Sequence, residues 1–125
     1  MDSDHLIELS RGRPSVQGRM AEVGLSICAV SEISMAELYV GYYKYGKKIE
    51  ALLDFLEESL QVVPINSAIK TYAQLRAQLE LSGQRVEDMD LFIAATAIAN
   101  DITLVTHNTR YFSRIPGLKL EDWIA

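Results

Sequence analysis

The hydrophobic and polar positions along this chain follow two periods, one typical of helices and one typical of strands. From residue 34 onward, apolar side chains recur at the helical spacing i, i+3, i+4, i+7 and i+8, and further amphipathic or wholly apolar stretches follow. Short apolar or β-branched runs separate them and predict strands. The pattern predicts helices at residues 4–10, 15–24, 34–45, 49–60, 68–81 and 88–99, and strands at residues 27–30, 60–65, 102–105 and 118–120.

Strands and helices therefore alternate, which predicts a three-layer α/β/α domain with a central parallel sheet. The length of 125 residues fits a single domain over residues 1–125. Only Met1 precedes Asp2, so the strand that usually opens such a domain is expected to be truncated. Open parallel sheets place their chemistry at the carboxyl ends of the strands, so we look for polar groups there.

Composition and charge narrow the class of protein. No apolar run reaches the roughly 20 residues that a membrane helix needs, and the acidic first residues lack the basic start of a signal peptide. Cys28 is the only cysteine, which fits a reducing cytoplasm and predicts a cytoplasmic protein without a membrane partner. The net charge of −5 argues against coating nucleic acid through the overall field, and it suits carboxylates gathered around cations.

Several oxygen-bearing side chains fall at predicted strand ends or helix starts on one edge of the sheet: Asp2, Glu37, Asp90, Thr106 and Asn108. Carboxylates packed together repel each other unless a cation screens them. Oxygen-only ligand sets suit Mg²⁺ or Mn²⁺, and such a site hydrolyses phosphate esters by activating water.

Each of these residues also has a purely structural interpretation. Ser34 and Glu37 have the spacing of a capping box, and Asp88 suits a helix cap. Asn108 and Thr106 are typical turn residues after a strand. Asp90 differs, because the helix it opens is apolar nearly all round and is therefore expected to be buried. For each residue taken singly, the structural interpretation is favoured. Only the placement of all of them on one edge of the sheet favours a metal site.

Four segments in series resemble the PIN-domain ribonucleases, and more specifically the VapC toxins of toxin–antitoxin pairs. They are Asp-Ser-Asp-His-Leu-Ile at 2–7, Ser-Met-Ala-Glu-Leu-Tyr-Val-Gly at 34–41, Asp-Leu-Phe-Ile-Ala-Ala at 90–95, and Leu-Val-Thr-His-Asn-Thr-Arg-Tyr-Phe at 104–112. The closing segment at 115–123 also fits, so the resemblance spans essentially the whole chain.

The resemblance implies a Mg²⁺- or Mn²⁺-dependent endoribonuclease that cleaves RNA of the tRNA or ribosomal class. It implies Asp2, Glu37 and Asp90 as metal ligands, with Asn108 at a fourth position and Thr106 beside it. It also implies a VapB-like antitoxin that blocks the site, and a homodimer or a toxin–antitoxin hetero-oligomer. Tyr111 departs from the pattern, since many relatives carry another acid there.

Two other functions stay open at this point. The truncated start leaves room for a catalytically weak PIN-fold binding module that acts by holding a protein partner. A phosphate-receiving regulatory domain is disfavoured, because no lysine closely follows Val105. Six basic residues could contact the phosphates of a nucleic acid, although a solvent-exposed surface role is at least equally favoured for each of them. They are Arg11, Arg13, Lys44, Lys47, Lys48 and Arg110.

Overall fold

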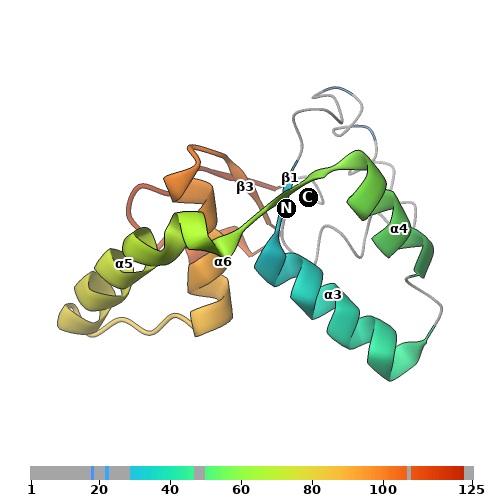
Figure 1. Cartoon of the computed structure of the whole chain (residues 1–125). Coiled ribbons are helices and arrows are strands. Elements are labelled where there is room, and N and C mark those ends of the chain that lie inside the picture. Colours follow the sequence, from blue (N-terminus) through green and yellow to red (C-terminus); the bar gives the residue numbers. More distant parts are fainter. Residues whose placement is uncertain (1–17, 19–21, 23–28, 47–49, 107, 123–125) are drawn as a thin grey trace.

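The short strands of the protein lie between two groups of helices. Figure 1 shows α3 (Glu32–Tyr45) and α4 (Glu50–Ser59) on one side of the strands, and α5 (Ile69–Leu81) and α6 (Asp88–Ala99) on the other. This arrangement confirms the predicted α/β architecture with helices on both faces. The computed structural model describes residues 18, 22, 29–46, 50–106 and 108–122. The remaining elements are β1 (Ala29–Ser31), β2 (Gln61–Val63), the 3-10 helix η3 (Ile65–Ala68), β3 (Leu104–Val105), α7 (Thr109–Phe112) and β4 (Leu120–Glu121).

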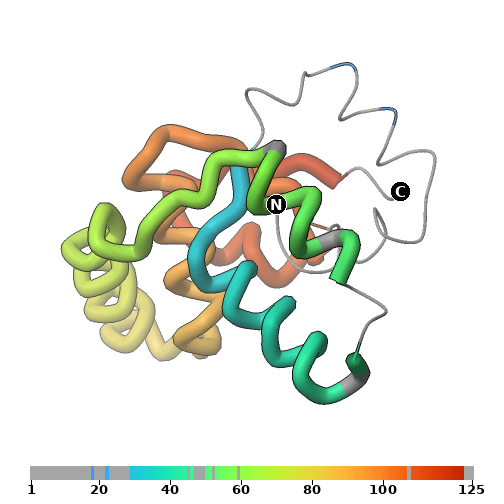
Figure 2. The backbone as a smooth tube through the Cα atoms, turned by 45° about the vertical axis from the view of Figure 1, so that its right-hand side comes forward, coloured from blue at the N-terminus to red at the C-terminus, as the bar shows by residue number. Residues whose placement is uncertain are grey.

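The strands of the described residues form two parallel pairs. Val30 of β1 lies opposite Val62 of β2, and Leu104 of β3 lies opposite Leu120 of β4. Figure 2 shows the cyan segment that contains β1 passing beside the green segment that contains β2. The parallel direction confirms the prediction from the alternating pattern, whereas the described strands form two separate pairs instead of one continuous sheet.

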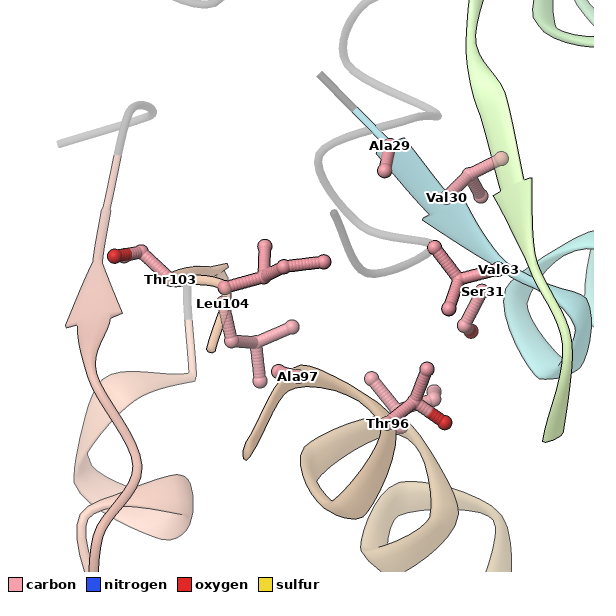
Figure 3. A pocket seen from close by; sticks show the side chains of 10 residues that line it. Ala29, Val30, Ser31, Val63, Thr96, Ala97, Thr103 and Leu104 are labelled. Carbon is pink, nitrogen blue, oxygen red and sulfur yellow. The ribbon is translucent and has the colours of Figure 1, made fainter. Parts of the chain in front are cut away.

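A hollow of about 30 Å³ lies between the two pairs of strands. Figure 3 shows Leu104 on one side of it, Ser31 and Val63 on the other, and Thr96 of α6 beneath. Asp2 and its surroundings lie outside the described residues, so the expectation for the start of the chain is not tested. The same holds for the helices predicted at 4–10 and 15–24, of which the structure describes only residues 18 and 22.

Helix α3 begins directly after β1 because Ser31 caps it. The Ser31 Oγ accepts a hydrogen bond from the Ser34 backbone N–H at 3.0 Å, which satisfies one of the free donors of the first turn. The helix therefore starts at Glu32, before the predicted start at residue 34. It ends at Gly46, whose φ of 77° is accessible to glycine without strain and whose N–H donates to the Tyr42 carbonyl.

Helix α6 forms the centre of the main hydrophobic core, as its sequence predicts. Leu91 is fully buried, and the ring of Phe92 stacks on Tyr72 of α5 with centroids 3.9 Å apart. Because a helix that is apolar on all sides is stable only when surrounded, its position between α3, η3 and α5 follows from its composition. The core cluster consists of Ala68, Leu75, Leu79, Val86, Leu91, Ile93, Ala94, Ala95, Ala97, Leu104, Phe112 and Ile115.

No helix within the described ranges is both long enough and apolar enough to cross a bilayer. The extent of the domain, residues 1–125, stays a prediction.

Candidate active site

Glu37 is a half-buried acid inside helix α3. The predicted capping box with Ser34 is wrong, because Ser31 is the N-cap and Glu37 lies beyond the first turn. The Oε1 atom of Glu37 is buried. Burying a carboxylate oxygen is costly unless a donor or a cation compensates its charge. This position is therefore unusual for an acid that only faces solvent.

Two acids in the first turn of α6 have different surroundings, and the first of them is Asp88. Its Oδ1 accepts hydrogen bonds from the Tyr72 hydroxyl at 2.8 Å and from Arg76 Nη2 at 2.7 Å. The hydrogen bond from Tyr72, followed by the charge of Arg76, lowers the pKa of the Asp88 carboxyl below its ordinary value. The prediction that Asp88 caps the helix is therefore wrong, because the N-cap is Glu87 and Asp88 ties α6 to α5.

The second acid, Asp90, is half-buried and faces Tyr111 of α7. The Tyr111 hydroxyl accepts a hydrogen bond from the Glu87 backbone N–H at 2.9 Å, three residues before Asp90. Burial raises the pKa of the Tyr111 hydroxyl, the bond from Glu87 opposes that rise, and the Asp90 carboxylate adds to it. The net shift is upward, so the phenol is held in its neutral form at the start of α6.

Thr106 and Asn108 form the turn that leads from β3 into α7. Thr106 is fully buried, and its Oγ1 accepts a hydrogen bond from the Asn108 backbone N–H at 3.0 Å. The Thr106 N–H donates to the Glu121 carbonyl at 2.9 Å, which extends the pairing of β3 with β4. Asn108 is exposed, and its carbonyl accepts from the Phe112 N–H at 3.2 Å. Thr106 is thus a structural anchor, and Asn108 is the residue of the pair that solvent or a ligand can reach.

The structure places two of the predicted metal ligands on helices that touch. Glu37 lies on α3 and Asp90 on α6, and these helices pack against each other. Asp2, the third predicted ligand, lies outside the described residues. Over residues 29–46, 50–106 and 108–122, no group of three His, Cys, Asp or Glu side chains is arranged to hold a metal ion. The donor atoms of Glu37 and Asp90 are carboxylate oxygens, which suit Mg²⁺ or Mn²⁺, and the buried oxygen of Glu37 fits a cation ligand.

Sequence reasoning did not find the contacts that surround the first turn of α6. Tyr111 was noted only as the absence of an acid, yet its hydroxyl accepts a hydrogen bond from the Glu87 backbone at the start of this helix. Tyr72 and Arg76 share one face of α5 at a spacing of i and i+4, and this spacing is the signal that could have identified a shared carboxylate partner.

Comparisons with known proteins define the class. The sequence model of the PIN domain matches residues 2–118. The chain is 40% identical over 98 residues to Ribonuclease VapC2 of Rickettsia felis, covering 76% of this chain and 73% of that protein. It is 27% identical to the tRNA(fMet)-specific endonuclease VapC of Shigella flexneri, covering 98% of this chain and 96% of that protein.

Solved structures agree with the sequence comparisons. The DNA-bound VapBC of Salmonella typhimurium matches with a TM-score of 0.88 and 29% identity, over 98% of this chain and 95% of that chain. VapBC2 of Rickettsia felis, bound to a DNA fragment from its promoter, matches with a TM-score of 0.85 and 33% identity, over 98% and 96% of the two chains. The chain therefore belongs to the PIN-domain family, within its VapC ribonuclease group.

Proposed function

We propose that this protein is a metal-dependent endoribonuclease toxin of the VapC type. The observation that carries the proposal is the placement of Glu37 and Asp90 on the packed helices α3 and α6, in a chain that matches VapC ribonucleases over nearly its full length. Glu37, Asp90 and Asp2 would hold Mg²⁺ or Mn²⁺. When bound, such an ion activates water and neutralises charge on the scissile phosphate.

The chain's own residues prepare this site in three ways. The buried oxygen of Glu37 keeps one carboxylate within the protein, out of bulk water. Tyr111 binds the Glu87 backbone N–H and so fixes the start of α6, the helix that carries Asp90. The turn fixed by Thr106 presents the exposed Asn108 side chain, whose amide would hydrogen-bond a water or a phosphate oxygen of the RNA.

The substrate would be structured RNA of the tRNA or ribosomal class. This part of the proposal is supported by the relatives in Shigella flexneri and Salmonella typhimurium, both of which are tRNA(fMet)-specific endonucleases. Incubation with total tRNA, ribosomal RNA and an unstructured RNA of matched length tests it. We expect discrete fragments from one of the first two, whereas equal degradation of all three would contradict a structured target.

A VapB-like antitoxin would bind the toxin and inhibit it. Support comes from the solved relatives in Rickettsia felis and Salmonella typhimurium, which are VapBC complexes bound to DNA. The homodimer that the family resemblance implies is part of the same proposal, and the mass of the purified chain in solution tests it.

The metal requirement is tested by RNA cleavage with and without EDTA, and by comparing Asp90→Asn with Asp88→Asn. Both variants remove one carboxylate from the same helical turn and keep a similar shape. We expect EDTA and Asp90→Asn to abolish cleavage, and Asp88→Asn to retain it because Asp88 is paired with Tyr72 and Arg76.

Cleavage that persists in EDTA would contradict the metal-dependent nuclease. A wild-type chain that binds its antitoxin but cleaves no RNA at any Mg²⁺ or Mn²⁺ concentration would instead support the alternative of a PIN-fold binding module.

A further inference from the structure

We propose that a pocket beside the start of α6 binds one unpaired base of the RNA substrate and selects bases that carry an amino group. The inference rests on the proposed function, because it takes RNA as the substrate. It deepens that function by giving one nucleotide of the RNA a binding position next to the cleavage site. The pocket has a volume of about 470 Å³, which lies in the range of pockets that hold small organic ligands.

The pocket lies one helical turn from the candidate metal ligand Asp90. Its wall includes Glu87, the N-cap residue of α6, and Tyr111 of α7. Asp90 follows Glu87 by three residues, a distance of about 5 Å along a helix axis. A base in this pocket can therefore belong to a nucleotide that directly flanks the phosphate at the metal site.

Hydrogen bonds from two different helices fix the loop that forms one wall of the pocket. The carbonyl of the buried Val86 accepts a hydrogen bond from Arg76 Nη2 of α5 at 2.8 Å. The N–H of the next residue, Glu87, donates to the hydroxyl of Tyr111 on α7 at 2.9 Å. All four residues line the pocket. Because the wall is already held in place, a ligand does not have to order it on binding.

Two arginines at the rim provide positive charge for the phosphates on either side of a bound base. Arg85 lines the pocket and is exposed. The Arg114 guanidinium lies 5.2 Å from the centroid of the Tyr111 ring, and its Nη1 donates to the Arg85 carbonyl at 3.4 Å. Guanidinium groups bind phosphate oxygens through charge-assisted hydrogen bonds. The rim therefore suits the RNA backbone.

Two acids decide which part of a nucleotide enters the pocket. Glu80 of α5 and Glu87 both line it, together with the amide side chain of Gln84. A carboxylate repels phosphate and accepts hydrogen bonds only, so it favours the amino groups of adenine, cytosine and guanine. Uracil has no amino group and presents carbonyl oxygens instead. We therefore place the base in the pocket and its phosphates at the arginine rim.

The lining favours RNA over a peptide segment of the antitoxin. Val86 is the only aliphatic side chain among the residues that line the pocket, whereas a groove for an apolar peptide face needs several. Unpaired bases are recognised by aromatic rings, by guanidinium planes and by hydrogen bonds to their edges. Tyr111, the arginines and the acids supply these three features.

The test measures binding of single-stranded oligo(A), oligo(C) and oligo(U) of equal length by fluorescence anisotropy, in EDTA to prevent metal-dependent cleavage. We expect oligo(A) and oligo(C) to bind about fivefold more tightly than oligo(U). Glu80→Ala combined with Glu87→Ala should remove this preference. Arg85→Gln should weaken binding of all three by about 5- to 10-fold and reduce the salt dependence by about one phosphate contact.

The control is Lys70→Gln, which removes an exposed cation of α5 outside the pocket and should stay within about twofold of the wild type. Backbone amide NMR spectra locate the contact. Adenosine monophosphate is expected to shift the signals of residues 84–87, and uridine monophosphate at the same concentration is expected to shift them less.

Equal affinity for the three oligomers, equal effects of Arg85→Gln and Lys70→Gln, or NMR shifts confined to other residues would overturn the inference. Unchanged RNA binding by Arg85→Gln together with weakened antitoxin binding would assign the pocket to the protein partner and would also overturn it. The proposed function can fail separately. A chain that binds and discriminates these oligomers but cleaves no RNA with Mg²⁺ or Mn²⁺ would contradict the nuclease and support the base pocket.

Discussion

Arg76 donates from Nη2 to Oδ1 of Asp88 at 2.7 Å and so joins the first turn of α6 to the middle of α5. The same nitrogen donates to the Val86 carbonyl at 2.8 Å, and Tyr72 completes the contacts of Asp88. One first-turn acid is thus used to hold two helices together. The other first-turn acid, Asp90, lies near Tyr111 instead. The two acids are close in sequence, but their surroundings differ.

Arg76→Gln is expected to destabilise the fold by about 1 kcal/mol, mainly through loss of the part-buried hydrogen bond to the Val86 carbonyl. The ion pair with Asp88 adds little, because that side chain is 73% exposed and solvent screens it. Denaturant unfolding measures the change. Lys70→Gln, which removes an exposed cation from the same helix, serves as the control and is expected to leave the midpoint unchanged. Equal midpoints for all three chains would show that the contact contributes nothing to stability.

Thr106→Val is expected to destabilise the chain by about 1 to 2 kcal/mol and to reduce RNA cleavage. Valine keeps the shape of threonine but removes Oγ1, which leaves the Asn108 N–H without its acceptor next to a fully buried side chain. Because the same turn leads into α7, the change also loosens the placement of Tyr111. Chemical denaturation and cleavage assays measure the two effects, and Thr106→Ser, which retains the oxygen, should restore both. If serine and valine behave alike, the hydroxyl is not the group that matters.

Much of the fold follows from local sequence pattern. The apolar spacing of 68–81 predicts α5 to within a residue at its start, since α5 spans Ile69–Leu81. The composition of 91–98, apolar except for Thr96, correctly predicts a helix at the centre of the core. The spacing of apolar residues is sufficient to predict an element whose structure depends on its own side chains. The reason is that burial of its apolar face is the main stabilising force.

Contacts between elements were harder to predict. The start of α3 depends on whether Ser31 or Ser34 supplies the cap, and both residues suit that role by type. The role of Asp88 depends on Tyr72, 16 positions away in the chain, and the spacing within α6 does not reveal this partner. The candidate acids were identified by their joint placement at one edge of the predicted sheet and by a resemblance in four segments, because each residue taken singly favours a structural role.

Ser31→Ala is expected to destabilise the chain by about 1 kcal/mol through loss of the α3 cap. The Ser34 hydroxyl loses a partner as well, because Ser31 Oγ donates to it at 3.1 Å within the buried start of the helix. Ser31→Thr keeps the capping oxygen and an extended backbone, so most of the stability should return. Thermal unfolding followed by circular dichroism measures both variants. A tolerated alanine together with a destabilising threonine would indicate that packing, and not capping, decides this position.

Glu37→Gln is expected to separate stability from activity. Glutamine has nearly the shape of glutamate, but it removes a negative charge from a half-buried position whose Oε1 is buried. Without divalent metal, the variant should have a stability close to that of the wild type, because glutamine fills the same space. Its Mn²⁺ affinity and RNA cleavage should fall by more than about 100-fold, since the loss of a metal ligand costs at least as much as the loss of a group that orients it.

The control is Glu57→Gln. Glu57 is an exposed acid on α4 that accepts a hydrogen bond from Tyr39, and its replacement should change neither metal affinity nor cleavage. Unfolding in EDTA, calorimetric titration with Mn²⁺ and RNA cleavage complete the measurement. A Glu37→Gln chain that loses stability and keeps its cleavage rate would show that Glu37 is a structural acid, and Asp90 would then need another partner at the metal site.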